Sequence, residues 1–340
     1  MIKEFISRLA GGEDLSQEEA TRTFQIIMNG GATPAQIAAI LMGLRIKGET
    51  AAEIAGSVIT MRAKMETLNA PEHCIDVCGT GGDASRESGS TLNVSTAVSL
   101  VVAACGVPVA KHGNKSVSSS SGSADVLTAL GVNIQAGKDK SETALREAGI
   151  CFMFAPLYHK SMRDITPVRQ ELGIRTLFNL LGPLANPAKP KRQLLGVYDR
   201  KLLHPMATVL KTLGSEKAWI VHGSDGMDEL TISGPSHICE LNGDTIRSFN
   251  ISPEDAGLEC AAPDALKGGT PEQNAHELSL LLTGKLSAYR DIVLLNAAAA
   301  LVVADKVADI KAGADLAAEA IDTRKALETL AELARITNSN

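Results

Sequence analysis

The spacing of apolar residues divides the chain into a helical first part and a longer part in which strands and helices alternate. In residues 1–70, apolar side chains such as Ile37, Ile40, Leu41 and Leu44 recur every three or four positions, which is the period of an amphipathic helix. Capping boxes mark three helix starts. They are Ser16 with Glu19, Thr33 with Gln36, and Thr50 with Glu53. The pattern predicts a small helical domain with an apolar face that would contact either another subunit or the main sheet.

From residue 73 onward, short apolar runs that suit buried strands alternate with helical segments. The expected strands are residues 75–77, 107–109, 132–134, 151–154, 194–198, 218–221, 238–241 and 245–249. The expected helices are residues 97–105, 124–130, 141–149, 206–213 and an Ala- and Leu-rich region from residue 277. This alternation predicts an α/β fold with a mostly parallel central sheet flanked by helices. Asn242-Gly243-Asp244 indicates a hairpin between the last two strands.

These patterns predict two domains. We expect a helical domain of residues 1–70, completed by helices within residues 165–190, and an α/β domain of residues 73–340. The run 178–187 contains two prolines and a glycine, so we do not expect it to form one regular element. It has the character of a crossing between the domains.

Composition limits the possible functions. Hydrophobic residues make up 44% of the 340 positions, which is enough for a large buried core, but aromatic residues make up only 3%. Few aromatic rings argue against a platform that stacks single-stranded nucleic acid. The formal net charge of −6 gives no overall positive field that would attract polyanions. A small anionic substrate would therefore need local donors, lysines or a metal ion.

The cysteines and the apolar runs indicate the cellular compartment of the protein. None of the six cysteines forms a Cys-x-x-Cys motif or has zinc-site spacing with histidine. The first residues show no secretory signal, and the longest apolar run, 97–110, is too short to span a bilayer. We expect a cytoplasmic protein with reduced, mostly buried thiols.

The strongest candidate chemistry lies within residues 76–123. A glycine loop, Cys78 to Asp83, follows the first strand, and glycines let backbone N–H groups approach an anion. Asn93-Val94-Ser95-Thr96 opens the next helix, where unpaired N–H groups and hydroxyls suit phosphate. A second loop, Lys111 to Ser119, brings two lysines, a glycine and several small polar side chains. Two such loops around one helix favour phosphate binding over an ordinary strand-to-helix turn.

Known phosphate motifs do not fit this stretch. Gly79, Gly81 and Ala84 match the loose dinucleotide spacing, but the polar run 83–90 delays the helix. No acidic residue follows at the distance that ribose binding requires, and no Gly-Lys-Ser/Thr sequence forms a Walker loop. We therefore do not expect a nicotinamide cofactor.

Two further clusters carry charge. His159, Arg163 and Arg169 are basic residues near a probable cleft, although each alone would also suit an exposed surface. Asp228 and Glu229 follow the strand 218–221, and adjacent carboxylates at a strand end favour a bound cation. A solvated acidic turn is the alternative, but the phosphate loops make bridging Mg²⁺ the better hypothesis.

Taken in order, these motifs resemble the anthranilate phosphoribosyltransferase family. The series is Gly79-Thr80-Gly81-Gly82-Asp83, Asn93-Val94-Ser95-Thr96, Lys111-His112-Gly113-Asn114, Ser121-Gly122-Ser123-Ala124-Asp125, Pro167-Val168-Arg169 and Asp228-Glu229. It covers essentially the whole chain. One feature differs: the family places a threonine four residues after the loop aspartate, whereas here Thr91 lies eight after Asp83. Lengthening a loop costs little free energy, so we expect activity to survive.

The resemblance implies a reaction of tryptophan biosynthesis. The anthranilate amine would attack C1 of phosphoribosyl diphosphate (PRPP), giving N-(5-phosphoribosyl)anthranilate and pyrophosphate, in a homodimer that needs Mg²⁺. The implied PRPP contacts are Gly79, Gly82, Asp83, Thr91, Asn93, Val94, Ser95, Thr96, Lys111, His112, Gly113, Asn114, Lys115, Ser116, Val117, Ser118, Ser119 and Ser123. The implied anthranilate contacts are Gly79, Asn114 and Arg169, with His112, His159 and Arg163 along its path. The implied metal ligands are Ser95, Asp228 and Glu229.

Two other functions of the same fold stay open at this point. A pyrimidine nucleoside phosphorylase would bind phosphate and a nucleoside, but the intact run Lys111 to Asn114 and the pair Asp228-Glu229 argue against it. A non-catalytic nucleic-acid-binding relative should have a basic surface and eroded motifs, whereas this chain is acidic and its motifs are complete. The sequence thus favours a phosphoribosyltransferase without nucleic-acid or membrane partners.

Overall fold

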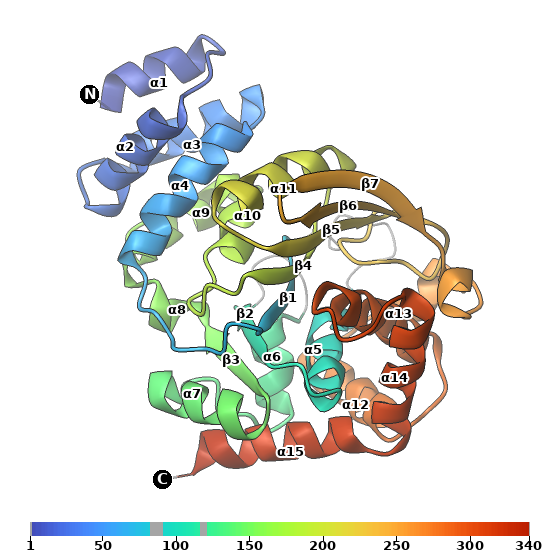
Figure 1. The fold of residues 1–340 in the computed structure, drawn as a ribbon. Helices are drawn as coiled ribbons and strands as arrows, with labels where there is room; N and C mark the ends of the chain where they lie inside the picture. Colours follow the sequence, from blue (N-terminus) through green and yellow to red (C-terminus); the bar gives the residue numbers. More distant parts are fainter. Residues whose placement is uncertain (1, 82–90, 116–120, 340) are drawn as a thin grey trace.

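The first part of the chain is a helical bundle. The computed structural model describes residues 2–81, 91–115 and 121–339. Four helices, α1 (Ile2–Ala10), α2 (Gln17–Met28), α3 (Pro34–Lys47) and α4 (Ala51–Lys64), form the bundle drawn in blue in Figure 1. The capping boxes at Ser16, Thr33 and Thr50 all form as predicted.

A seven-stranded sheet forms the centre of the larger part. Its strands are β1 (Ile75–Gly79), β2 (Val109–Gly113), β3 (Ile150–Phe154), β4 (Arg192–Gly196), β5 (Lys217–Gly223), β6 (Ser236–Asn242) and β7 (Thr245–Ile251). Their spatial order is β3-β2-β1-β4-β5-β6-β7. The first five strands in this order are parallel, and β6 and β7 continue the sheet as an antiparallel hairpin. The predicted α/β class with a mostly parallel sheet is confirmed.

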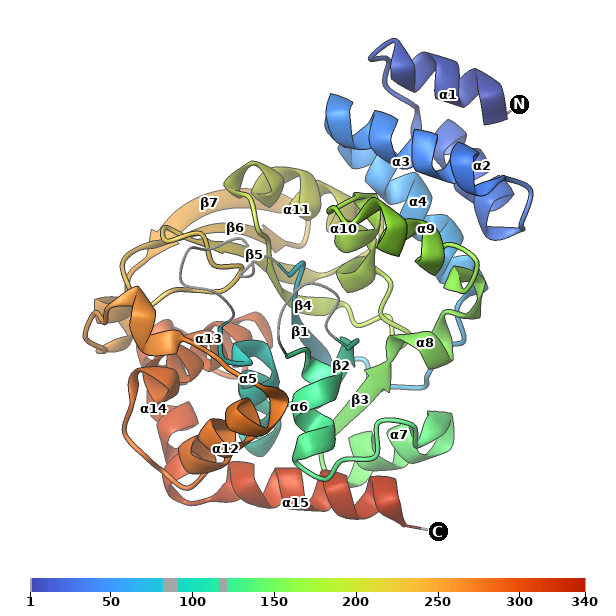
Figure 2. The ribbon, with the colours of Figure 1, turned by 180° about the vertical axis from the view of Figure 1, so that it is seen from behind.

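Helices cover both faces of this sheet (Figures 1 and 2). They are α5 (Val94–Ala104), α6 (Ser123–Ala129), α7 (Gly137–Glu147), α8 (Ala155–Tyr158), α9 (Thr166–Leu172), α10 (Leu177–Leu184), α11 (Leu203–Thr212), α12 (Pro271–Leu282), α13 (Ala288–Val303), α14 (Ile310–Asp322) and α15 (Lys325–Asn338). Helix α15 runs along the end of the molecule that is far from the helical bundle. None of the helices in the described ranges is long and apolar enough to cross a bilayer.

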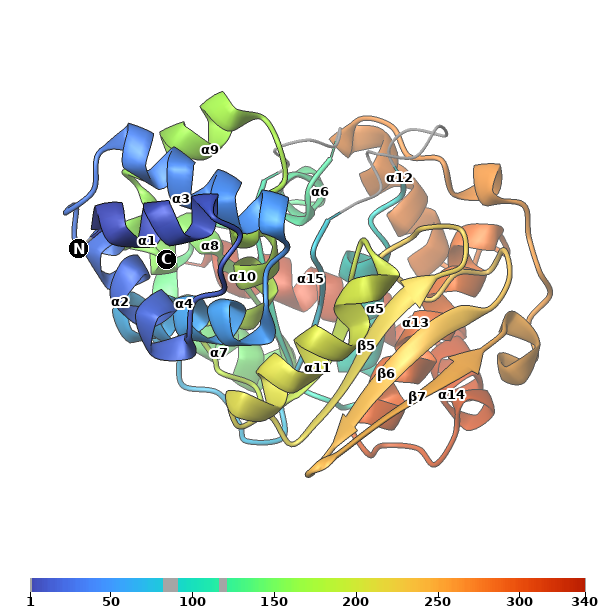
Figure 3. The same cartoon turned by 90° about the horizontal axis from the view of Figure 1, so that it is seen from above.

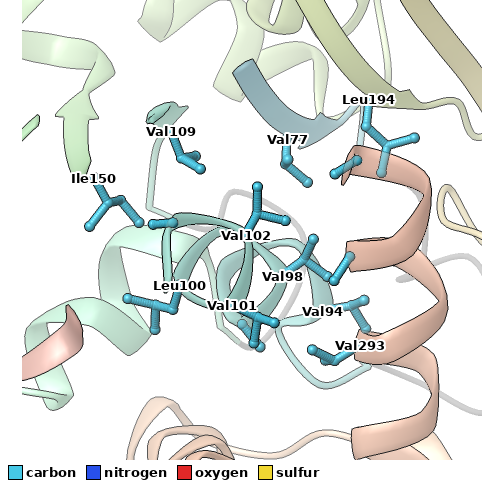
Figure 4. Packing of buried hydrophobic residues seen from close by; sticks show 14 of the residues in the cluster. Val77, Val94, Val98, Leu100, Val101, Val102, Val109, Ile150, Leu194 and Val293 are labelled. Carbon is cyan, nitrogen blue, oxygen red and sulfur yellow. The ribbon is translucent and has the colours of Figure 1, made fainter. Parts of the chain in front are cut away.

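Alternating side chains of the sheet point into two separate cores. Leu194 belongs to the core under α5 and α13, whereas its neighbour Leu195 belongs to the core shared with the helical bundle. Figure 4 shows Val98 and Val102 of α5 packed between Val77 of β1 and Val293 of α13. This two-sided burial follows from the period of two along a strand.

The helical bundle packs against the sheet. Its second core combines α4 residues such as Val58 with Leu181 of α10 and with Ile220 of β5. Of the two predicted contacts for the apolar face of the bundle, the one with the main sheet is therefore observed within this chain. Figure 3 shows α9 beside α3 of the bundle, and the two helices are in contact.

Two predicted elements were wrong in detail, and one segment expected to be irregular begins with a helix. Residues 132–134 form no strand, because the Val132 N–H donates to the Leu127 carbonyl (3.0 Å) and continues the turn that ends α6. The run 178–187 is not one regular element, as predicted, but its first part is helical: α10 ends at Leu184, with Pro183 inside its last turn. Helix α7 begins at Gly137, four residues before the predicted start.

Candidate active site

The centre of the sheet is a point where the chain reverses direction. The chain builds β1, β2 and β3 toward one edge and then returns to place β4 on the other side of β1. Ligands of open α/β sheets bind outside the carboxyl ends of the strands at such a switch point. Here Gly79 and Gly196, the last residues of β1 and β4, are paired side by side. They mark the floor of the site.

Asp228 lies directly on this pair of glycines. A Cβ atom on Gly79 would come within 2.2 Å of Asp228 Oδ2, and one on Gly196 within 1.4 Å of the Asp228 carbonyl oxygen. Only glycine leaves room for that approach. The Gly81 N–H also donates to Asp228 Oδ2 (2.8 Å). The glycine loop after β1 and the acidic pair are therefore one structure, although about 150 residues separate them in the sequence.

The three predicted metal ligands surround one small cavity. Ser95, Asp228 and Glu229 line a space of about 10 Å³ next to Gly196, roughly the room that one water molecule needs. Two carboxylates and a hydroxyl are hard oxygen donors, which suit Mg²⁺ when a phosphate and water complete its shell. The described residues contain no cluster of three or more His, Cys, Asp or Glu side chains that could enclose a metal on their own. The site thus fits a divalent cation shared with a ligand.

Lys111 supports this cavity from inside the protein. Its side chain is buried, and Nζ donates to the Val77 carbonyl (2.8 Å) and to Ser95 Oγ (3.2 Å). Burial lowers the pKa of the Lys111 ammonium, while nearby acidic groups oppose that shift. Lys111 therefore fixes the Ser95 hydroxyl from beneath the site.

The start of α5 is less open to a ligand than its sequence indicates. The side chains of Val94 and Thr96 are buried, and the Val94 N–H already donates to the Leu92 carbonyl (2.8 Å). Thr91 is buried and forms an isolated bridge with Lys267. Asn93 and Ser95 remain half-buried at the helix start.

The second predicted loop begins where β2 ends. A Cβ atom on Gly113 would lie 2.3 Å from Ser123 Oγ, so glycine lets the two segments meet. The Asn114 carbonyl accepts the Ala124 N–H (3.2 Å), and Asn114 Oδ1 accepts the Lys115 N–H (2.8 Å). Gly82, Asp83, Ser116, Val117, Ser118 and Ser119 lie outside the described residues.

A larger cavity of about 790 Å³ opens between the carboxyl ends of β1 and β2 and helices α8–α10. This volume is typical of small-molecule sites. Every predicted anthranilate residue lines it: Gly79, His112, Asn114, His159, Arg163 and Arg169. The sequence-derived set, scattered over 90 residues, converges on one cavity beside the acidic pair.

Arg169 is the charged group best placed to bind an acid in this cavity. Its guanidinium carbon lies 5.3 Å from the centre of the Phe178 ring, a separation typical of a cation–π contact. Burial lowers the pKa of Arg169, and it forms no ion pair with the carboxylates of the described ranges. A half-buried guanidinium without an acidic partner favours a carboxylate ligand.

Two buried imidazoles form part of the wall of this cavity. The ring centroids of His112 and His159 are 5.1 Å apart, and His112 Nδ1 lies 3.2 Å from the Gly182 carbonyl oxygen. Burial lowers the pKa of His112 to about 3 and that of His159 to about 4. Both rings are therefore neutral at pH 7 and add no positive charge beside Arg169.

Several lining residues were not predicted from the sequence. They include Met61, Phe178, Asn179, Gly182 and Pro183. Residues 178–187 were interpreted only as a crossing between the domains. The pair Gly182-Pro183 in this run was the one sequence signal that it could form part of a cavity wall. Arg163, by contrast, was predicted and lies at the rim, with its side chain 91% exposed.

Comparison with known proteins agrees with this geometry. A family model described as "Glycosyl transferase family, helical bundle domain" matches residues 3–65, and one described as "Glycosyl transferase family, a/b domain" matches residues 71–327. An anthranilate phosphoribosyltransferase of Parvibaculum lavamentivorans is 54% identical to this chain, covering 99% of it and 98% of the relative. One of Rhodopseudomonas palustris is also 54% identical, covering 98% and 97%.

Solved structures are similar over the whole chain. The crystal structure of anthranilate phosphoribosyltransferase from Thermus thermophilus aligns with a TM-score of 0.91 at 39% identity, covering 98% of this chain and 99% of that one. The Saccharomyces cerevisiae enzyme in complex with PRPP and Mg aligns with a TM-score of 0.90 at 25% identity, covering 100% and 98%.

Proposed function

Because the chain belongs to the anthranilate phosphoribosyltransferase family, within the glycosyl transferases that join a helical bundle to an a/b domain, we propose that it transfers the 5-phosphoribosyl group of PRPP to anthranilate. The products are N-(5-phosphoribosyl)anthranilate and pyrophosphate, and the reaction serves tryptophan biosynthesis. One observation carries the proposal. The cavity that contains Arg169 and Asn114 also reaches Gly79, on which Asp228 lies, so an aromatic acid and a diphosphate sugar can meet there.

PRPP binds at the switch point in this proposal. Its diphosphate lies against the Gly79–Gly81 backbone and the start of α5, where Asn93 and Ser95 are half-buried. Ser95, Asp228 and Glu229 hold Mg²⁺, as their shared cavity supports, and the yeast relative was solved with PRPP and Mg. The bound ion neutralises charge on the leaving pyrophosphate.

Anthranilate binds in the larger cavity. Arg169 pairs with the carboxylate, and the neutral His112 and His159 line the path of the ring. Asn114, at the end of β2, lies between the two substrates and orients the amine toward C1. The aromatic amine is neutral near pH 7, so the attack needs no strong base.

The chemical step breaks the C1–oxygen bond, whose electron pair leaves with pyrophosphate. The amine lone pair forms the new bond to C1, and the nitrogen then releases a proton to solvent. The protein contributes orientation and positioned hydrogen-bond donors, including Lys111 Nζ beneath Ser95. No covalent ribosyl-enzyme intermediate is needed.

A fluorescence assay tests this function. Protein, Mg²⁺, PRPP and anthranilate are mixed, and the loss of anthranilate fluorescence is followed together with pyrophosphate release. Equal amounts of anthranilate consumed and pyrophosphate formed are expected. Phosphorolysis of thymidine or uridine, with no turnover of anthranilate, would instead identify a nucleoside phosphorylase.

The assembly is also a proposal. We propose a cytoplasmic homodimer that contacts through the helical domain, taken as residues 1–70 completed by helices within 165–190. Ile46 at the end of α3 and Ile174 after α9 expose large apolar side chains on this part of the chain, which supports a contact there. Light scattering coupled to size exclusion should give twice the mass of one chain.

A further inference from the structure

A hydrogen-bonded cluster joins the starts of α5, α12 and α13 to the segment before α6, behind the proposed diphosphate site. The carboxamide of Asn274, in the first turn of α12, donates through Nδ2 to Asn93 Oδ1 (2.9 Å). Asn93 in turn donates through Nδ2 to the Ser121 carbonyl (3.1 Å), just before α6. The Tyr289 hydroxyl, in α13, donates to the Asn93 carbonyl (3.0 Å). Asn93 is thus held by groups from α12, α13 and the segment before α6.

Backbone groups fix the direction of this chain of bonds. The Gly269 N–H donates to Asn274 Oδ1 (2.8 Å), so the other end of that carboxamide must be the donor. Asn93 therefore presents its oxygen to Asn274 and its nitrogen to the Ser121 carbonyl. Because a main-chain group stands at each end of this series of hydrogen bonds, neither carboxamide can rotate by 180° without losing a hydrogen bond.

A second contact fastens the same region. The Leu92 N–H donates to the Leu266 carbonyl (3.0 Å), and Thr91 bridges to Lys267. A Cβ atom on Gly268 would lie 2.4 Å from the Thr91 carbonyl oxygen. The turn that leads into α12 therefore packs directly against residues 91–93.

Burial makes this cluster costly to break. Asn274 is 1% exposed and Tyr289 is 2% exposed, and a buried carboxamide is stable only when its polar atoms are paired. Helix α12 contacts α6, and α13 contacts α5, as Figure 2 also shows. The cluster thus couples the C-terminal helices to both segments that face the diphosphate.

We propose that Asn274 is a positioning residue for PRPP. Through Asn93 it sets the separation between the start of α5 and Ser121, so that both segments reach the same diphosphate. The proposal rests on the proposed function, because it assumes that PRPP binds between them. Asn93, Ser121 and Asn274 are absent from the lining of the 790 Å³ cavity as the described residues define it, so the effect should fall on PRPP and spare anthranilate.

The test compares Asn274→Asp with Gln273→Glu in the full-length protein. Asp at 274 keeps the volume and the bond from Gly269, but sets an acceptor against Asn93 Oδ1. Gln273 is the exposed neighbour on α12 and accepts the Thr270 N–H through its side chain (2.9 Å). Glu can keep that bond, so Gln273→Glu adds the same charge and leaves the cluster intact.

Losing one hydrogen bond and adding repulsion should weaken Mg²⁺-dependent PRPP binding about tenfold. Calorimetry should show that rise in the PRPP dissociation constant for Asn274→Asp, and steady-state assays a similar rise in its KM. The KM for anthranilate should change less than about twofold. Tyr289→Phe removes one bond to the same Asn93 and should act in the same direction, which keeps the test available if Asn274→Asp fails to fold.

Different results separate the two ideas. A wild-type protein that neither binds PRPP nor turns over anthranilate would contradict the proposed function, and the positioning role with it. An active wild type whose folded variants bind PRPP normally would overturn the positioning role alone. The positioning role would also be overturned if Asn274→Asp weakened the binding of PRPP and raised the KM for anthranilate equally. The same would hold if Gln273→Glu weakened PRPP binding as much as Asn274→Asp does.

Discussion

Replacing Arg169 by Gln tests how the cavity recognises an aromatic acid. The change removes the positive charge of Arg169 from the cavity wall and leaves a shorter, neutral polar side chain. A hydrogen bond to a charged group contributes about 1.5–3 kcal/mol, so kcat/KM for anthranilate should fall about 10- to 150-fold. Because Arg169 packs on Phe178 rather than in the sheet, the melting temperature should change little.

Two comparisons isolate the carboxylate contact. Arg175→Gln is the matched protein control, because the Arg175 guanidinium carbon also lies over an aromatic ring, 4.7 Å from the centre of Tyr198, and does not line the cavity defined by the described residues. It should retain nearly full activity. The second comparison uses 2-aminobenzamide, in which a neutral amide replaces the carboxylate.

With this neutral substrate, Arg169→Gln and the wild type should have similar kcat/KM values. The reasoning would be refuted if the two arginine variants lost activity equally. It would also be refuted if the deficit of Arg169→Gln persisted with 2-aminobenzamide, because that loss could not come from pairing with a carboxylate.

Three further predictions concern the acidic pair, the floor of the site and the buried imidazoles. Asp228→Asn together with Glu229→Gln should lower turnover by at least about a thousandfold, because the pair holds the cation that contributes several kcal/mol, while circular dichroism stays unchanged. Gly196→Ala should displace Asp228, whose carbonyl oxygen lies 1.4 Å from the new Cβ, and should cost about 1–3 kcal/mol of stability together with PRPP binding in calorimetry. The lowered pKa values of His112 (about 3) and His159 (about 4) mean that the unfolded chain binds more protons below pH 6.5. Stability should therefore fall as pH drops from about 6.5 toward 4, by about 2 kcal/mol per ring at pH 5, as urea unfolding at pH 7.5 and pH 5 would measure.

Each of these predictions has a result that contradicts it. Wild-type rates in the double acidic variant would remove the cation from the account. Gly182→Ala, at a site with no atom within 4 Å of the new Cβ among the described residues, is the control for Gly196→Ala and should fold normally; equal stability of the two would contradict the predicted clash. His159→Phe should lose about half of the pH dependence, and an unchanged slope would show that the imidazoles are not its source.

Much of the fold could be predicted because local signals and tertiary structure agree. The capping boxes at Ser16, Thr33 and Thr50 depend only on neighbouring residues, and all three form. The hairpin at Gly243 follows from its turn residues, and β6 and β7 pair as expected. The strand predicted at 132–134 was wrong because its apolar residues pack beneath α15 without a neighbouring strand, as the Asn133 N–H to Thr337 Oγ1 bond shows (3.2 Å).

The sequence could predict which residues belong to the candidate site, but not which of them contact one another. Motifs marked Gly79, Asp228 and Arg169 as separate clues, and the family resemblance, which the comparisons confirm, gave each of them a role. No local pattern links Gly196 to Asp228 or Asn274 to Asn93, since these contacts arise from the sheet order and from the packing of α12. Phe178 was missed because a proline-rich run hid the helix that carries it.

A crystal structure of the protein with Mg²⁺, PRPP and anthranilate tests the central claim most directly. The account predicts the diphosphate against Gly81 and Asn93, with a cation between it and the Asp228–Glu229 pair. It also predicts the anthranilate carboxylate at Arg169, with the amine facing C1 of the ribose. Density for the sugar diphosphate away from the switch point, or an anthranilate whose amine cannot reach C1, would contradict the account.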